Sequence, residues 1–577
     1  MNGDTLLQSS QTGGWLKFHR PLEIITTTDP LQVRPLLDQI EQSVNQHGLF
    51  AAGFLTYEAA SAFDPAYRVH SPSSLPLLWF GLYSPPSPVG PPLKQGTFKL
   101  EHWQPAIEQA AYETALLKIK NYIRRGETYQ VNYTMRLRTP FAGDPQGLFS
   151  RLVDGQRSEY AAYIDTGASV ICSASPELFF RRDGAAVTAK PMKGTAARGR
   201  TWLEDERQID WLRNSLKNRA ENVMIVDMVR NDLGRVATAG SIQVPQLFEV
   251  ERYPTILQMT STITARSSAS TAEIMAALFP CASITGAPKM RAMEIIHQLE
   301  PEPRGIYTGC IGYIGPNQQA QFNVAIRTVV IDQTSGVAEY GVGGGIVWDS
   351  ETAQEYQECR LKAKVLTEPR RPDFDLLETM LWEPDSGYFL LAEHLHRLTT
   401  SARYFTIPVD ANHLRHALET VAASLDRPHR VRLLIAPNGD ITTQAIPLDS
   451  PPVQKRWRVA LARQPVNAND IFLFHKTTHR QVYTTAREAQ PDCDEVILWN
   501  EQGQVTEATI ANIVVQFGHE LVTPPIECGL LAGTYRAHLL AQQAIRERII
   551  TVEELKHSDR IYLINSVRTW IEAELVA

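Results

Sequence analysis

The sequence is poor in cysteine, and no two of its cysteines lie close together. Its six cysteines show no Cys-x-x-Cys spacing, which argues against a disulfide framework and against a structural zinc site. We therefore expect a reducing, cytoplasmic compartment. The first twenty residues lack the basic start and apolar core of a signal peptide. No apolar run approaches the roughly 20 residues that a membrane helix needs, so we expect no membrane association.

The chain also lacks an excess of charge of one sign. Its 56 Lys and Arg residues and 63 Asp and Glu residues give a net charge of -7. The basic residues are dispersed, and they form no stripe that could neutralise a run of phosphates. We therefore expect no nucleic-acid partner, and a small acidic substrate would need a local positive pocket.

The length of 577 residues exceeds what one hydrophobic core usually organises. The clearest seam is residues 367–373, where two prolines flank two arginines after a charged helical stretch and cannot continue it. We predict one domain over residues 1–370 and a second over residues 371–577. In the first domain, runs rich in β-branched residues alternate with helix-patterned runs, which predicts an α+β fold built on large sheets.

Two glycine-bearing segments of the first domain have residues suited to chemistry. Lys193 stands directly before Gly194, and glycine lets the backbone approach a ligand closely. A nucleophilic lysine must be neutral, so burial or a nearby cation must depress its pKa from about 10.4. A solvated loop lysine is the ordinary alternative. Gly343 to Gly345 offer either successive amides for an anion or a plain glycine turn.

A pair of glutamates lies on an expected helix near the end of the first domain. Glu355 and Glu358 are three residues apart, so they share a helix face, where a Mg2+ ion would relieve their repulsion. The alternative is a salt-bridged helix face, because three cations follow directly. These cations are Arg360, Lys362 and Lys364.

The second domain has one lysine in a suggestive place. Lys476 follows the apolar segment 471–474, which predicts a lysine at the end of a strand, where side chains commonly line sites. An ordinary structural lysine is the alternative.

Taken together, the motifs of the first domain form a recognisable order. Residues 100–366 closely resemble the chorismate-utilising enzymes, which include anthranilate synthase and aminodeoxychorismate synthase component I. The resemblance implies their fold of large β-sheets with helices. The matching motifs are residues 125–132, 173–179, 191–195, 227–235, 283–289 and 349–364.

The resemblance also implies site residues. Anthranilate synthases similar to this chain carry alanine at the position of Lys193, whereas aminodeoxychorismate synthases carry lysine and use it as a covalent nucleophile on the ring. Glu177 then acts as general acid for the leaving hydroxyl. The implied Mg2+ ligands are Glu221 and Glu358, with Glu355 beside them. The implied groups for the carboxylates and the pocket wall are Gly194, Thr195, Tyr307, Arg327, Gly343, Gly344 and Gly345.

The second domain resembles fold-type IV pyridoxal-phosphate (PLP) enzymes over roughly residues 374–575. The resemblance rests on the order of Lys476, the segment 505–515 and the segment 529–536. It implies an α/β domain in which Lys476 holds PLP covalently and shuttles protons, and Glu507 pairs with the pyridine nitrogen. The implied phosphate cradle consists of Arg397, backbone amides near Thr534 and Tyr535, and a second turn at Ser566 and Val567.

The two resemblances imply a bifunctional enzyme of p-aminobenzoate synthesis. The first domain would aminate chorismate to 4-amino-4-deoxychorismate, and the second would eliminate pyruvate from it. Lyase activity is preferred to transamination because of the fusion, not because of pocket residues. No Gly-x-Cys-x-Gly glutaminase segment occurs, so ammonia would come from a separate glutamine amidotransferase subunit or from solution. One candidate assembly is a homodimer through the PLP domain.

Two alternatives differ from this interpretation. The first is an anthranilate synthase component I joined to a fold-type IV aminotransferase, against which Lys193 already counts. The second is a catalytically silent scaffold that recruits a glutaminase. The presence of Glu177, Lys193, Lys476 and Glu507 argues against such a scaffold.

Overall fold

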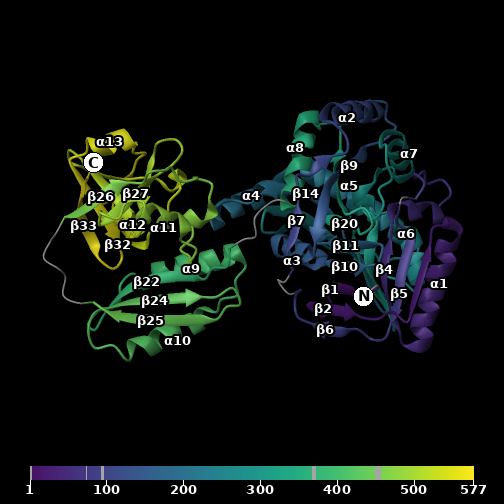
Figure 1. Ribbon diagram of the computed structural model, residues 1–577, viewed down its shortest axis with the longest axis horizontal. Coiled ribbons are helices and arrows are strands. Elements are labelled where there is room, and N and C mark those ends of the chain that lie inside the picture. Colours follow the sequence, from purple (N-terminus) through teal and green to yellow (C-terminus); the bar gives the residue numbers. More distant parts are fainter. Residues whose placement is uncertain (1–2, 73, 93–95, 367–371, 449–455, 577) are drawn as a thin grey trace. The chain divides into compact units, whose positions relative to one another are not determined.

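The computed structural model describes residues 3–72, 74–92, 96–366, 372–448 and 456–576 (Figure 1). The chain folds into two compact units. The first comprises Met1–Ala197 and Ile209–Arg371, and the second comprises Arg198–Gln208 and Pro372–Ala577. The predicted domain boundary at residue 370 lies outside the described residues. Nothing in the sequence indicates that Arg198–Gln208 packs with the second unit.

Two large sheets form the first unit (Figure 1). The first sheet runs in the order β17 (Gly286–Ala287), β9 (Gln130–Gly143), β21 (Val337–Ile346), β20 (Thr328–Asp332), β11 (Ser169–Ser173), β10 (Ala162–Asp165), β1 (Thr5–Ser9), β2 (Gly14–Phe18) and β6 (Ser87–Val89), and β7 (Phe98–Leu100) and β8 (Gln104–Pro105) also pair with β9. The second runs in the order β14 (Met192–Ala197), β16 (Ile256–Arg266), β13 (Ala186–Lys190), β12 (Leu178–Asp183), β19 (Gln319–Val324), β18 (Cys310–Gly315), β4 (Phe50–Leu55), β5 (Leu78–Tyr83) and β3 (Glu23–Thr27), and β15 (Gln243–Arg252) pairs with β16.

The sheets pack face to face, and helices cover their outer faces. Buried side chains of both sheets, such as Phe18, Phe54 and Ile171, form one core between them. A second core lies under helices α1 (Pro30–His47), α5 (Leu216–Gly234) and α6 (Thr271–Leu278). A third lies under α2 (Gln109–Arg124), α3 (Pro145–Gln156), α7 (Lys289–Leu299) and α8 (Thr352–Ala363). This architecture confirms the α+β fold predicted for the first domain.

Helix α1 illustrates how the sequence sets such a covering helix. Asp29 caps it by accepting a hydrogen bond from the Leu31 amide, and Gly48 closes it with a left-handed backbone. Four apolar residues at spacings of four, three and four fall on one face and are buried, as expected for an amphipathic helix. They are Val33, Leu37, Ile40 and Val44.

The second unit contains a small and a larger sheet (Figure 1). The small sheet runs β23 (Gly387–Tyr388), β22 (Leu376–Glu383), β24 (His429–Ile435) and β25 (Ile441–Pro447), with α9 (Leu391–Phe405) and α10 (Ala411–Ala422) packed on it. The larger sheet runs β28 (Val505–Ala508), β27 (Glu495–Trp499), β26 (Trp457–Leu461), β33 (Thr569–Leu575), β32 (Arg560–Asn565), β29 (Asn512–Phe517), β30 (Glu520–Thr523) and β31 (Arg546–Glu547). The other helices are α11 (Gln481–Glu488), α12 (Thr534–Ala541) and α13 (Val552–Lys556), and α4 (Trp202–Asn214) begins in this unit.

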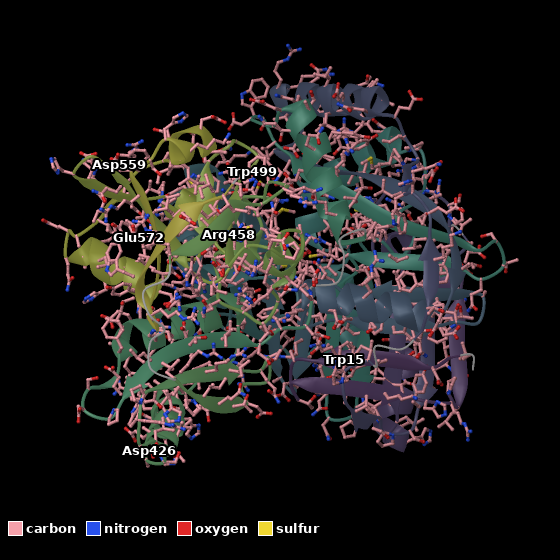
Figure 2. All side chains as sticks on the ribbon, turned by 60° about the vertical axis from the view of Figure 1, so that its left-hand side comes forward. Trp15, Asp426, Arg458, Trp499, Asp559 and Glu572 are labelled. Carbon is pink, nitrogen blue, oxygen red and sulfur yellow. The ribbon has the colours of Figure 1, made fainter. Side chains whose placement is uncertain are left out.

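The second unit is the predicted mixture of helices and sheets, with one local difference. Figure 2 marks Arg458 and Trp499 on the larger sheet and Asp426 in the turn before β24, well away from them. The apolar segment before Lys476 forms a short 3₁₀ helix, Ile471–Leu473, and not the predicted strand. Asp470 caps this turn by accepting from the Phe472 amide, which favours a helical turn over an extended chain. Within the described ranges, no helix is both long and apolar enough to cross a membrane.

Candidate active sites

The first unit encloses a cavity of about 440 Å³, and every residue predicted for the first site lines it. Strand β14 contributes Lys193, Gly194 and Thr195, and the segment before β12 contributes Glu177. Helices α5 and α8 contribute carboxylates, and strand β21 and the loops before β18 and β20 complete the wall. The remaining predicted residues on this wall are Glu221, Tyr307, Arg327, Gly343, Gly344, Gly345, Glu355 and Glu358.

The amine of Lys193 lies directly against the backbone of β21. A Cβ atom placed on Gly345 would lie 2.5 Å from Lys193 Nζ and 2.7 Å from Gln130 Nε2, so any other residue there would displace the amine from this position. Burial lowers the pKa of Lys193, and although Glu221 opposes this effect, Lys362 adds to it. The surroundings therefore favour the neutral amine that a nucleophile needs.

Glu177 is a buried carboxyl with a single strong hydrogen bond. Its side chain is 2% exposed, and Ser283 Oγ donates to its Oε1 at 2.6 Å. Burial raises the pKa of Glu177 to about 7, although the bond from Ser283 and the nearby Lys193 pull in the other direction. Glu177 can therefore hold a proton near neutral pH. Sequence reasoning assigned no role to Ser283, because nothing in the motif 283–289 links it to a residue 106 positions away.

The glycines of β21 form neither the turn nor the amide nest that the sequence suggested. They lie in an extended strand, where Gly343, Gly344 and Gly345 stand opposite residues of β9. The Gly343 carbonyl accepts from Lys362 Nζ at 2.9 Å, on the side away from β9. Because alternate residues of an antiparallel strand direct their polar groups to the same side, the Gly345 amide faces that side too. The edge of β21 that faces away from β9 therefore presents backbone N–H donors to the cavity.

The predicted metal ligands share the cavity wall but differ in the hydrogen bonds and ion pairs that they already make. Lys362 Nζ lies 2.7 Å from Glu358 Oε1, so the salt-bridged alternative holds for this residue. Ser350 Oγ donates to Glu355 Oε1 at 2.7 Å. Glu221 has no hydrogen bond or ion pair with any described residue, and burial raises its pKa, with Glu358 contributing in the same direction.

These carboxylates alone do not supply enough ligands for a divalent cation. Among the described residues, no three His, Cys, Asp or Glu side chains stand close enough together to hold a metal. The negative charge of Glu358 contributes to the raised pKa of Glu221, and a bound cation would offset this repulsion. They fit a Mg2+ site completed by a substrate carboxylate and water, and Glu355 stays bound to Ser350.

Tyr307 and Arg327 line the same cavity. The Tyr307 ring packs against Gly341, and the Arg136 guanidinium lies 5.2 Å from its centre. Arg327 donates to Gln156 Oε1 at 3.0 Å and has a backbone φ of 52°. A non-glycine residue held there costs roughly 1–3 kcal/mol, and such strain clusters at functional sites.

The second unit encloses a cavity of about 420 Å³, and every residue predicted for the second site lines it. Lys476 lies in the loop after the 3₁₀ helix, and its carbonyl accepts from the Leu377 amide of β22 at 2.9 Å. Burial lowers the pKa of Lys476 to about 8, and the nearby Arg397 and Arg480 lower it further. The predicted residues that share the cavity with it are Arg397, Glu507, Thr534, Tyr535, Ser566 and Val567.

Glu507 is a buried carboxyl without a salt bridge among the described residues. Tyr483 Oη donates to its Oε1 at 2.8 Å, as does the Leu531 amide at 3.1 Å, and Asn512 Nδ2 donates to its Oε2 at 3.3 Å. Burial raises the pKa of Glu507 to about 7, despite these bonds and Lys476. A protonated pyridine nitrogen would supply the missing cation, so this residue fits PLP.

Some of the groups predicted to bind the phosphate already have other hydrogen-bond partners. Glu378 Oε1 and Oε2 accept from Arg397 Nε and Nη2 at 2.8 and 2.6 Å, and the Ala532 carbonyl accepts from Nη1 at 3.1 Å, which leaves two N–H groups of the guanidinium for an anion. Thr534 begins α12, whose first amides suit a phosphate. The Val567 amide already donates to Asn565 Oδ1 at 3.0 Å, so the second turn offers fewer donors than predicted.

Sequence reasoning missed the group that holds Arg397 in place. Glu378 also accepts from His394 Nδ1 at 2.7 Å. Burial alone would raise the pKa of Glu378, but Arg397 and His394 outweigh it and hold the pKa at about 2. The only signal was a glutamate within an apolar, strand-like run, and the sequence does not show which cation it meets.

A piece of the chain far away in sequence supports the Lys476 loop. The carbonyl of Arg200 lies 3.1 Å from Nε2 of His475, the residue before Lys476. Tyr404 Oη donates to the Gly199 carbonyl at 2.7 Å, and the Arg200 guanidinium lies 4.7 Å from the Phe474 ring centre. The second unit thus includes the segment Arg198–Gln208 as a support for this loop.

Comparison with known proteins agrees with both halves. Residues 4–368 match the family described as chorismate binding enzyme, and residues 375–576 match amino-transferase class IV. Aminodeoxychorismate synthase component 1 of Salmonella typhimurium is 40% identical over 269 residues, which cover 46% of this chain and 59% of that protein. The same component of Bacillus subtilis is 40% identical over 254 residues, which cover 44% of this chain and 54% of that protein.

The chain thus spans little more than half the length of the curated relatives that it matches. Among solved structures, anthranilate synthase component I of Streptococcus pneumoniae superposes with a TM-score of 0.53 at 24% identity, covering 63% of this chain and 92% of that one, which shows a shared fold. The family match spans more than half of the present sequence. The chain therefore belongs to the chorismate binding enzyme family, and residues 375–576 join to it a domain that matches the class IV amino-transferases.

Proposed function

We propose that the first unit aminates chorismate to 4-amino-4-deoxychorismate and that the second converts this product to p-aminobenzoate and pyruvate. One observation carries the first assignment: the Lys193 amine, whose pKa burial lowers, lies against Gly345 in the same cavity as the protonatable Glu177. Relatives that share this part of the chain are named aminodeoxychorismate synthase component 1.

In the first unit, Lys193 would form a covalent bond to the ring and Glu177 would donate the proton. Lys193 would add to C2 of the ring while the C4 hydroxyl leaves with the proton of Glu177. Ammonia would then add at C4 as the lysine nitrogen leaves C2, which restores the free amine. Covalent catalysis divides one difficult displacement into two easier ones.

The remaining cavity residues would hold the substrate. Tyr307, Arg327 and the backbone amides of Gly343 and Gly345 present donors to its carboxylates. Glu221 and Glu358 would hold Mg2+, which supplies a charge that binds the ring carboxylate. Since the relatives are named as a first component, we infer that a separate glutamine amidotransferase subunit supplies ammonia.

In the second unit, Glu507 would face the pyridine nitrogen of PLP. Arg397 and the first amides of α12 would hold its phosphate, and Lys476 would hold the cofactor aldehyde through its amine. PLP, when bound, supplies the electron sink that loss of a proton from carbon requires. Once the substrate amine has replaced it on the cofactor, the Lys476 amine would take the proton from C4 of the substrate. Cleavage of the C3–O bond would then release the side chain, which regains a proton as pyruvate, and leave the aromatic product.

Two further parts of the proposal concern the setting. All six cysteines are free thiols, which favours a reducing, cytoplasmic compartment. A homodimer through the second unit is the assembly that we propose from its family, and light scattering of the full chain would test it.

The experiment for the first unit compares Lys193→Ala with Lys118→Ala, an exposed lysine on α2. With chorismate and ammonium chloride, Lys193→Ala should lose most formation of the para-amino product, and Lys118→Ala should retain it. A Lys193→Ala enzyme with unchanged para product would remove the lysine from the mechanism. Formation of ortho-aminobenzoate by the unaltered chain would overturn the assignment of the first unit.

A further inference from the structure

Strand β24 of the small sheet directs two arginines into the cavity of the second unit. Val431 and Leu433 point into the core and are buried. Arg430 and Arg432 alternate with them, lie on the other face of the strand and line the cavity. This face of the sheet therefore carries two positive charges toward the site.

The two guanidinium groups have no partners in the part of the chain that the structure describes. Neither Arg430 nor Arg432 makes a side-chain hydrogen bond or an ion pair there, and Arg430 Nε is buried without an acceptor. A buried donor without an acceptor is costly, so a ligand that presents acceptor oxygens at this place would gain by satisfying it. By contrast, Arg397 is paired with Glu378 and Arg536 with Glu547.

The remaining lining cations are also engaged. Arg480 donates to the Thr509 carbonyl and lies 4.5 Å from the Tyr483 ring centre. Arg568 lies 4.9 Å from the Trp457 ring centre. Because Glu507 is the only carboxylate on the described cavity wall, the unpaired arginines have no internal counter-charge.

The pair shares the cavity with the reacting lysine but is separated from its loop by one strand. Strand β22 lies between β24 and the Lys476 loop, because the Leu377 amide of β22 donates to the Lys476 carbonyl at 2.9 Å. Thr379 of the same strand stands opposite Arg432 in the ladder and also lines the cavity. Arg432 therefore lies on the strand next to β22, and β22 contacts the Lys476 loop directly.

We propose that Arg430 and Arg432 bind the carboxylates of the amine substrate and select a cyclic amine with two carboxylates over monocarboxylate amino acids. The inference deepens the proposed function of the second unit and rests on it. Two unpaired guanidinium groups match the two negative charges of 4-amino-4-deoxychorismate. Guanidinium is also the group best suited to bind carboxylates through paired hydrogen bonds.

The alternative role for the pair is to hold the cofactor phosphate. Arg397 retains free N–H groups after binding Glu378, and α12 begins with Thr534 at the cavity wall. These groups form a phosphate site without help from β24. The substrate role therefore predicts that loss of either β24 arginine leaves PLP binding intact.

The experiment uses the PLP-loaded full chain and the variants Arg430→Gln, Arg432→Gln and the corresponding lysine variants. Arg415→Gln, an exposed arginine on α10, is the matched control. Pyruvate release from added 4-amino-4-deoxychorismate gives KM and kcat, and a PLP titration followed by absorbance gives cofactor affinity. Chorismate, with two carboxylates, and benzoate, with one, serve as inhibitors.

Each glutamine variant should raise KM roughly 10- to 100-fold, the effect of losing one charge-assisted hydrogen-bonded pair. Inhibition by chorismate should weaken more than inhibition by benzoate, while PLP affinity stays unchanged. The lysine variants should recover part of the loss, because they keep the charge. Arg415→Gln should match the unaltered chain.

Two results would overturn the inference. An unchanged KM with unchanged chorismate inhibition would remove the pair from substrate binding, and a loss of PLP affinity alone would assign it to the cofactor. Failure of the proposed function looks different: the unaltered, PLP-loaded chain would then release no pyruvate from the added substrate.

Discussion

The amine of Lys193 occupies the space that a side chain on Gly345 would fill. The two residues lie 152 positions apart in sequence, and a methyl group on Gly345 would stand 2.5 Å from the lysine nitrogen. This contact gives the glycine a role in an extended strand, where it has no conformational advantage. It also makes the amine's position testable by substitution of Gly345.

Gly345→Ala should lower amination at least about 100-fold, because a displacement of about 1 Å at a reacting group can cost that much. The control is Gly90→Ala, since a Cβ at Gly90 meets nothing within 4 Å. Initial rates with chorismate and ammonium chloride measure the effect, and circular dichroism checks folding. A Gly345→Ala protein with full activity would show that the amine does not act from this position.

Amination should decrease as the pH rises through about 7. Burial raises the pKa of Glu177 to about 7, so the proton that it must donate is present below this pH and is lost above it. The rates must be compared at a constant concentration of free ammonia, because ammonium itself loses a proton at higher pH. Glu177→Gln should lower activity by about 100-fold or more.

Ser283→Ala offers a finer test of the same carboxyl. The Ser283 hydroxyl donates to Glu177 at 2.6 Å and lowers the pKa of Glu177 by stabilising its charged form. Removal of the hydroxyl should raise the pKa of Glu177 and move the decreasing limb of the pH profile to higher pH. A limb that stays in place, or moves to lower pH, would show that another group controls it.

Covalent attachment of PLP to the apoprotein should accelerate as the pH rises through about 8. Burial lowers the pKa of Lys476 to about 8, and only the neutral amine attacks the cofactor aldehyde. Absorbance measures the rate, and borohydride followed by peptide mapping locates the bond. A midpoint near the ordinary lysine value of about 10.4 would contradict the buried environment.

Glu378→Gln should destabilise the second unit by about 3 kcal/mol, because it removes the buried charged partner of Arg397. The pKa of Glu378 is held at about 2, below its unfolded value, so its contribution is present above about 4.5 and is lost as the pH falls toward 2. The difference in unfolding free energy between the unaltered chain and Glu378→Gln should shrink over that range. Glu383→Gln, an exposed change on the same strand, is the control for urea unfolding.

The sequence predicts which residues line each cavity better than it predicts the hydrogen bonds and ion pairs that those residues make. Lys193, Glu177 and Glu358 lie in separate motifs, yet all line one cavity. The pairing of Glu358 with Lys362 was an open alternative, because four-residue spacing on a helix allows it but does not require it. Contacts such as that between Ser283 and Glu177 depend on how distant segments pack.

Three features could not be predicted for the same physical reason. The strand conformation of Gly343 to Gly345 depends on pairing with β9, which local glycine content does not indicate. The assignment of Arg198–Gln208 to the second unit depends on contacts with residues some 200 to 275 positions later. Arg430 and Arg432 look like ordinary strand residues until the cavity on their face is known.

The most direct test follows both products of one incubation. The full chain, loaded with PLP and Mg2+, receives chorismate and ammonium chloride, and p-aminobenzoate and pyruvate are measured together over time. The account predicts equal amounts of the two products, and it predicts that Lys476→Ala accumulates 4-amino-4-deoxychorismate with little of either. Pyruvate accompanied by ortho-aminobenzoate, or an unchanged yield of p-aminobenzoate from Lys476→Ala, would contradict it.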